Sequence, residues 1–209
     1  MGPSRVVPLN PSAIRQSLFP GLGACVVLAL AGPGSPASAL EVILVRHGHK
    51  DVSRGDFNLS PQGLQRALTL GRLIPACFGA PTRIISYPFN PRTGKNSRSY
   101  QTLVPLGVAT GVTIELAEDG MNHSEAVGSR LRARLSSTQE RVVMAWEHRR
   151  MPDLAKGLGW PAMRPIADDD FEQLLIFRYR DPSGLPTVQL DQQSALLQRP
   201  CFQRATTER

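Results

Sequence analysis

The sequence predicts an α/β fold of three layers, with a mostly parallel central sheet and helices on both faces. Short runs of apolar and β-branched residues alternate along the chain with segments whose apolar residues recur at helical spacing. The first of these runs, EVILVRHG, contains four consecutive apolar residues, as strands covered on both faces do. Of the 209 residues, 41% are hydrophobic and 20% charged, which is the composition of a globular protein.

The first 39 residues have the pattern of a secretory signal peptide. They contain two arginines and no acidic residue, and a short apolar run precedes Ala37 and Ala39, the small residues of a signal-peptidase site. The run is shorter than a membrane span of about twenty residues. An uncleaved anchor and a lipoprotein signal at Cys25 are the alternatives. We expect a signal peptide over 1–39, one domain over 40–209, and a periplasmic or secreted protein without stable membrane insertion.

The charge balance and the cysteines limit the partners and the compartment. Removal of the two N-terminal arginines lowers the net charge of +7 by two. A modest, scattered positive charge suits an anionic substrate and argues against a nucleic-acid partner. Cys77 and Cys201 remain in the predicted domain. They either form a disulfide that ties the C-terminal tail to the body, or stay a buried thiol and a tail thiol.

Local signals define the elements in chain order. After the first strand, Ser60 followed by Pro61 is an N-cap with proline at the first helical position, and a helix is predicted over 61–74. A short helix begins near Arg98, and Pro105 is expected to end or kink it. The last two strands are expected to be antiparallel at an edge. The remaining predicted elements are strands at 82–87, 112–116, 141–146, 173–179 and 186–190, and helices at 124–136 and 151–158.

Basic side chains follow the predicted strands at the ends where ligands bind in parallel sheets. His47 follows the first strand and His148 the fourth, while Arg46 and Arg98 are expected at the same rim. Guanidinium groups match phosphate oxygens and keep their charge at any working pH. A neutral imidazole can then attack phosphorus without a metal, with the other groups stabilising the charge on the equatorial oxygens. Gly48 would let the chain turn close to the anion.

Other interpretations of the polar residues are less consistent with this pattern. A metal site built from His47 and His49, with Asp51 nearby, has suitable spacing, but two arginines would repel the cation and the carboxylate ligands expected of such a site are lacking. We therefore expect His49 at the rim. His123 is expected to be a loop residue before a helix, and Arg149 and Arg150 are expected to form an exposed basic edge. The acidic run from Asp168 to Asp170 is expected in a loop or at a helix start rather than as a metal cluster.

Four segments extend the pattern over most of the predicted domain: LVRHG (44–48), LSPQGLQRA (59–67), SRSYQT (97–102) and VVMAWEH (142–148). In their order and spacing, over roughly residues 40–180, they resemble the histidine phosphatase superfamily, also called phosphoglycerate mutase-like. Related sequences of the WEH type are small bacterial proteins. The resemblance implies a metal-independent phosphatase without a cofactor, which acts on small phosphorylated substrates.

The resemblance also assigns roles to individual residues. It implies that His47 is the nucleophile that becomes phosphohistidine and that His148 is the second histidine of the pocket. Arg46 and Arg98 correspond to the phosphate clamp. Lys50 stands where some members of the superfamily place another basic phosphate contact.

The proton donor is the least defined part of the predicted site. An alkoxide leaves poorly without a proton, and many members of the superfamily supply a carboxyl group from a loop between the second arginine and second histidine. That loop, AEDGMNHSE, contains Glu118, Asp119 and Glu125, of which the first two are favoured here. Glu147 is an alternative, although neighbouring strand residues point to opposite faces. A site without a dedicated acid is also consistent with the sequence.

Three alternative functions stay open. A phosphomutase would have to hold the phosphoryl group away from water, and this short chain has few segments long enough to form a lid. A catalytically weak protein could use the same arginine pocket to bind a phosphorylated or carboxylated ligand. The third alternative is metal-dependent hydrolysis.

Overall fold

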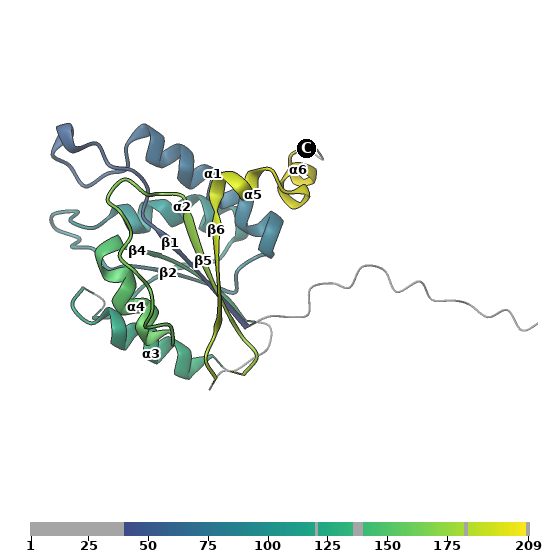
Figure 1. Cartoon of the computed structure of the whole chain (residues 1–209). Coiled ribbons are helices and arrows are strands. Elements are labelled where there is room, and N and C mark those ends of the chain that lie inside the picture. Colours follow the sequence, from purple (N-terminus) through teal and green to yellow (C-terminus); the bar gives the residue numbers. More distant parts are fainter. Residues whose placement is uncertain (1–39, 120, 136–139, 182–183, 208–209) are drawn as a thin grey trace, which may run out of the picture. The chain divides into compact units, whose positions relative to one another are not determined.

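A six-stranded mixed sheet forms the centre of the domain (Figure 1). The computed structural model describes residues 40–119, 121–135, 140–181 and 184–207, so the predicted signal peptide lies outside the described residues. The strands lie in the order β3-β2-β4-β1-β5-β6. Their bounds are β1 Leu40–Arg46, β2 Arg83–Ser86, β3 Ile114–Leu116, β4 Arg141–Trp146, β5 Gln173–Tyr179 and β6 Thr187–Gln192.

Helices cover both faces of the sheet, as the sequence predicts. Figure 1 shows α1 and α2 on one side of the strands and α3 and α4 on the other. No helix within the described residues is long and apolar enough to span a membrane. The helices are α1 Pro61–Phe78, α2 Arg98–Thr110, α3 Ser124–Arg134, α4 Met151–Gly157, α5 Gln193–Leu197 and α6 Pro200–Thr207, with short 3-10 helices η1 Val52–Arg54 and η2 His148–Arg150.

Strand β1 contributes to both hydrophobic cores because its side chains alternate between the faces. Val42 and Leu44 belong to the core beneath α3 and α4, whereas Ile43 and Val45 belong to the core beneath α1 and α2. All four are fully buried. Burial of such side chains stabilises the fold by about 1.5–3 kcal/mol each, so β1 is firmly held where its carboxyl end delivers Arg46 and His47.

The last two strands, β5 and β6, are antiparallel at one edge of the sheet, as predicted. β1, β2, β3 and β4 pair in parallel, β5 runs antiparallel to β1, and β6 runs antiparallel to β5. β5 takes the inner position because Leu174, Leu175, Ile176 and Phe177 are buried on both faces. The more polar β6 is therefore left at the edge.

Two helices are longer than predicted. α1 begins as expected, with Ser60 Oγ accepting a hydrogen bond from the backbone of the first turn, but it continues beyond residue 74 to Phe78. α2 passes through Pro105 and ends before Gly111, which adopts a left-handed conformation. Pro105 packs against Gly71 of α1, where an added Cβ would lie 3.0 Å from the Pro105 carbonyl carbon. This close packing leaves no room for a side chain at Gly71.

The C-terminal segment is fastened to the side of the domain that carries α1. A disulfide joins Cys77 in the last turn of α1 to Cys201 in α6, so of the two states left open by the sequence the structure has the paired one. Phe202 of α6 joins the core beneath α1 and α2.

Candidate active site

The two predicted histidines meet at the carboxyl ends of adjacent strands. β1 and β4 are parallel neighbours with Arg46 opposite Trp146, and the backbone N–H of His47 donates to the Trp146 carbonyl at 3.1 Å. His47 and His148 are 6% and 5% exposed. Their ring centroids lie 5.8 Å apart with the planes inclined at 73°. The expected pairing across about a hundred residues of sequence is therefore present in the fold.

His47 is arranged as a neutral imidazole. Its Nδ1 lies 2.8 Å from the Gly48 carbonyl oxygen, which can only accept, so Nδ1 carries the proton. Burial lowers the pKa of His47 to about 3; the Gly48 hydrogen bond opposes this shift, and the charges of Arg46, Arg98 and His148 reinforce it. The lone pair therefore resides on Nε2, which makes no hydrogen bond within the described part of the chain. A neutral nitrogen with a free lone pair is the form required of a nucleophile.

Gly48 links the His47 loop to the helix that carries Arg98. Its N–H donates to Thr102 Oγ1 at 2.8 Å, and this hydroxyl donates to the Arg98 carbonyl at 2.7 Å. A Cβ on Gly48 would lie 3.0 Å from the Gly63 carbonyl oxygen in α1. Close packing on α1 is therefore the reason for glycine here, which refines the expectation that it serves a turn beside the anion.

The SRSYQT segment positions Arg98 and holds the loop beside it. Gln101 Oε1 accepts from the Leu59 backbone at 2.9 Å, and Ser97 Oγ donates to the Phe57 carbonyl at 2.8 Å. The Arg98 guanidinium lies 5.9 Å from the Phe57 ring centroid. These polar residues belong to one of the four segments that resemble the superfamily. Their contacts could not be derived from the sequence, because their partners lie about forty residues earlier in the chain.

Arg46 is held by the loop that precedes β5. Its Nη1 donates to the carbonyls of Ala167 and Asp170 at 2.8 and 2.7 Å, and Nη2 donates to the Asp168 carbonyl at 2.8 Å. The guanidinium also lies 3.8 Å from the ring centroid of Phe171. Three of its five N–H groups are thereby used. The remaining two, on Nε and Nη2, are not used within the described residues, and Nε is buried.

His148 lies between two carboxylates. Its Nε2 is 2.7 Å from Asp168 Oδ1, and its Nδ1 is 3.1 Å from Glu147 Oε1. Because β4 ends at Trp146, the alternation that counted against Glu147 no longer applies after that residue. Ligand atoms of His47, Glu147 and His148 lie within 4.8 Å of one another. Glu147, the alternative acid, thus lies at the site, although the alternation of side chains along a strand counted against it in the sequence.

Three buried nitrogens of the site have no hydrogen-bond partner among the described residues: Arg46 Nε, Arg98 Nε and His148 Nδ1. Buried polar atoms in folded proteins are rarely left without a partner. Burial lowers the pKa of both arginines, but they remain cations at any working pH. The unused N–H donors and positive charges of Arg46 and Arg98 around a neutral nucleophile suit a tetrahedral anion with several acceptor oxygens.

The same cluster is less suited to a cation. His47, Glu147 and His148 are the group with metal-ligand geometry found among the described residues. However, the charges of Arg46 and Arg98 bear directly on the His47 ring and would repel a cation bound at its free Nε2. His49, the partner of His47 in the alternative metal site, stacks on Phe171 with the ring centroids 3.8 Å apart.

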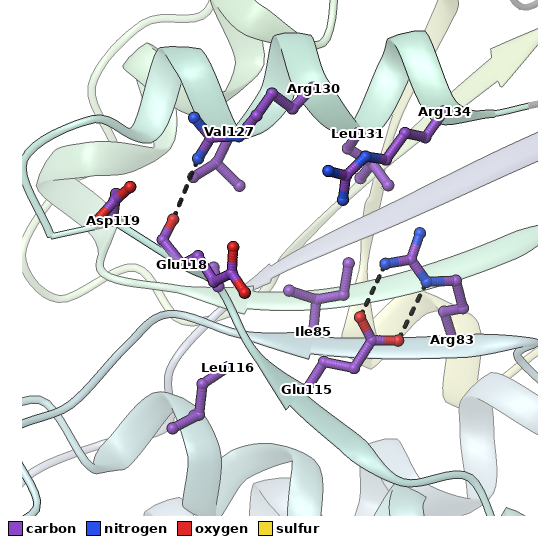
Figure 2. Close-up of a pocket in the computed structure, with 11 residues that line it drawn as sticks. Arg83, Ile85, Glu115, Leu116, Glu118, Asp119, Val127, Arg130, Leu131 and Arg134 are labelled. Carbon is purple, nitrogen blue, oxygen red and sulfur yellow. Dashed lines mark hydrogen bonds and ion pairs between the residues drawn. The ribbon is translucent and has the colours of Figure 1, made fainter.

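The favoured acids of the 117–125 loop line a different cavity. Glu118 and Asp119 contribute to a cavity of about 370 Å³ between β2, β3 and α3, and none of its lining residues belongs to the site around His47. Figure 2 shows Arg130 reaching the Glu118 carbonyl and Arg83 paired with Glu115 in this cavity. Glu125 pairs with Lys156 Nζ at 3.0 Å on the surface. The structure does not bring these acids to His47.

The remaining predicted contact, Lys50, has an exposed side chain after β1. Arg149 and Arg150 are exposed as expected, and Arg150 pairs with Asp153 at 3.7 Å. The acidic run from Asp168 to Asp170 lies in a loop, as expected, but Asp168 also contacts both Arg46 and His148. It is the site residue that sequence reasoning missed.

Comparison with known proteins supports the fold. No protein-family model and no curated protein sequence matches the chain. The solved structure of the protein histidine phosphatase SixA complexed with tungstate is similar, with 17% identity, a TM-score of 0.56, and coverage of 75% of this chain and 99% of that one. A mycobacterial hydrolase matches with 18% identity, a TM-score of 0.50, and coverage of 73% of this chain and 97% of that one. The chain therefore has the α/β fold of the histidine phosphatases, and the predicted resemblance is confirmed at the level of the fold.

Proposed function

We propose that this protein is a phosphatase that hydrolyses phosphate monoesters through a phosphohistidine on His47, without a resident metal. The observation that carries the proposal is the neutral His47 ring, with Nε2 free and with unpartnered donors on Arg46 and Arg98 beside it. The similar SixA structure is complexed with tungstate, a tetrahedral oxyanion of phosphate-like shape, which supports an oxyanion site in this fold.

The proposed reaction has two displacements at phosphorus. His47 Nε2 attacks the phosphorus, the bond from phosphorus to the ester oxygen breaks, and that oxygen leaves as the alcohol after it takes a proton. Water then attacks the phosphohistidine, the bond from phosphorus to nitrogen breaks, and inorganic phosphate leaves with His47 neutral again. Arg46 and Arg98 hold the non-bridging oxygens, where charge builds up in both transition states, and His148 lies beside them.

Glu147 is the carboxyl group best placed to move the proton. In the first step its carboxyl would protonate the leaving oxygen, and in the second its carboxylate would take a proton from the attacking water. Its ligand oxygen lies within 4.8 Å of ring nitrogens of His47 and His148. Glu118 and Asp119 are the competing candidates from the sequence, and they line the cavity beside α3.

The dependence of the hydrolysis rate on the leaving group tests which carboxyl group donates the proton. An aryloxide leaves from phosphorus without first taking a proton, whereas an alkoxide leaves poorly unless it is protonated. Glu147→Gln should therefore slow alkyl ester hydrolysis far more than aryl ester hydrolysis. Glu118→Gln and Asp119→Asn are the matched controls, with little effect on either. An alkyl-selective loss in one of these controls, with Glu147→Gln unaffected, would return the role to the 117–125 loop.

Hydrolysis of an aryl phosphate by the purified protein tests the overall proposal. Activity should survive a chelator, be inhibited by vanadate and vanish in His47→Ala. Activity lost to the chelator and restored by a metal would establish metal-dependent hydrolysis instead. Tight phosphate binding without turnover of aryl or alkyl esters would establish the catalytically weak binding protein.

We further propose that the protein is exported to the periplasm or secreted. The signal-peptide pattern of residues 1–39 and the disulfide between Cys77 and Cys201 support this location. N-terminal sequencing of the protein from fractionated cells should find Leu40 as the first residue in the exported fraction. A chain that keeps Met1 in the cytoplasmic fraction would contradict the proposal.

A further inference from the structure

Asp168 contacts two residues of the site that come from different strands. It lies in the segment between α4 and β5, where its backbone carbonyl accepts from Arg46 Nη2 at 2.8 Å. Its side-chain Oδ1 lies 2.7 Å from His148 Nε2. The two contacts use different atoms of one residue, so they are mutually compatible. They place Asp168 at the junction of the second histidine and the buried arginine.

The backbone around Asp168 is well anchored. Ala167 and Asp170 supply carbonyls to Arg46 Nη1, and the Asp170 N–H donates back to the Ala167 carbonyl at 3.1 Å. Asp170 Oδ1 accepts from the Glu172 N–H at 2.9 Å. Phe171 is 8% exposed and packs against the Arg46 guanidinium. The exposed Asp168 carboxylate is therefore presented to His148 from a fixed loop.

The contact determines which nitrogen of His148 faces the site. A carboxylate oxygen accepts, so Nε2 carries the proton that bonds to Asp168, and Nδ1 is directed toward the Glu147 side. Carboxylates that bond one ring nitrogen of a functional histidine commonly fix its tautomer and orientation. The hydrogen bond from His148 also lowers the pKa of Asp168, which keeps this carboxyl ionised at neutral pH.

We propose that Asp168 is a positioning residue, whose carboxylate fixes the tautomer and orientation of His148 while its carbonyl helps to aim Arg46 at the same bound phosphate. This inference rests on the proposed phosphatase function for its catalytic consequence, but the contact with His148 can be measured independently. The charged or titratable groups around His148 are Asp168, Glu147, Arg149, Arg46 and His47.

Asp168→Ala in the full-length protein removes the carboxylate and leaves the carbonyl that Arg46 uses. Asp169→Ala is the matched control, because the Asp169 side chain is exposed and makes no hydrogen bond within the described residues. Outer carboxylates that orient functional groups typically contribute 10–100-fold to activity, and exposure favours the low end. We expect kcat to fall about tenfold in Asp168→Ala with KM nearly unchanged, since Arg46 and Arg98 still bind phosphate. Asp169→Ala should match the wild type, and Asp168→Glu should recover part of the loss.

Nitrogen-15 NMR of the imidazole of His148 provides the readout that does not depend on turnover. The wild type should show the proton on Nε2, and Asp168→Ala should shift the ring toward a mixture of tautomers. An unchanged His148 spectrum would overturn the inference, as would a kcat in Asp168→Ala equal to or above that of the wild type. An increase would mean that the carboxylate obstructs the phosphate. If the wild type does not turn over any ester but the His148 signal still depends on Asp168, the proposed function fails and the contact stands.

Discussion

Acidification should destabilise the protein through His47. This ring is 6% exposed and its pKa is lowered to about 3, whereas an unfolded chain gives histidine a pKa of about 6.5. The unfolded state therefore binds a proton at pH values where the folded state does not. The stability that comes from His47 is fully present above pH 6.5 and is lost as the pH falls toward 3.

The magnitude follows from the difference between the two pKa values. One pKa unit corresponds to about 1.36 kcal/mol, and between pH 7 and pH 4.5 the unfolded histidine becomes almost fully protonated while the folded one stays neutral. The free energy of unfolding should therefore fall by about 2.5 kcal/mol from this residue alone. Arg46 and Arg98 reinforce the low pKa, because a cationic His47 would lie beside their positive charges.

Urea denaturation of the wild type and of His47→Asn at both pH values isolates this contribution. The other titrating groups are common to both proteins and largely cancel in the comparison. In buffers without phosphate, the wild type should lose about 2.5 kcal/mol more than His47→Asn between pH 7 and pH 4.5. Equal losses in the two proteins, within about 0.5 kcal/mol, would refute a neutral, buried His47.

Three further predictions concern the surroundings of His47. Arg98→Lys keeps the charge but loses the unpartnered Nε–H, so kcat/KM should fall at least about tenfold, the equivalent of one charge-assisted hydrogen bond; an unchanged value would exclude Arg98 as a phosphate ligand. Gly48→Ala places a methyl group 3.0 Å from the Gly63 carbonyl and should displace His47, with a loss of about a hundredfold in kcat in a protein that still folds; near-normal kinetics would contradict the close packing. The double variant Cys77→Ser and Cys201→Ser should lower the free energy of unfolding by about 2–4 kcal/mol with kcat unchanged; equal stability to the oxidised wild type would argue against the disulfide.

The parts of the fold that depend on local pattern are predictable from the sequence. β1 and β4 are apolar runs, and the basic residues after them identify the rim because parallel strands end on the same side. The inner position of β5 was not predictable, since strand order depends on packing between segments far apart in sequence. The continuation of α2 through Pro105 was likewise not predictable, because the local preference of proline is to end or kink a helix.

The residues of the site likewise fall into two groups, those that local pattern locates and those that only the fold locates. His47, Arg46, Arg98 and His148 follow strand ends or begin a helix, so pattern and resemblance locate them. To place Glu147 at the site, one must know that β4 ends at Trp146. If β4 were one residue longer, the alternation of strand side chains would direct the Glu147 carboxylate to the opposite face. Asp168 belongs to a loop without periodicity, and its role arises only from the fold that brings this loop to Arg46 and His148. An acidic run followed by Phe171 was the available signal, and such runs are usually surface features.

The central claim is that a phosphoryl group passes through His47. Rapid mixing with an aryl phosphate, an alkaline quench and mass spectrometry should find acid-labile phosphate on His47, formed and lost at rates consistent with kcat and absent from His47→Asn. Turnover without any phosphohistidine, or activity retained in His47→Asn, would contradict the account.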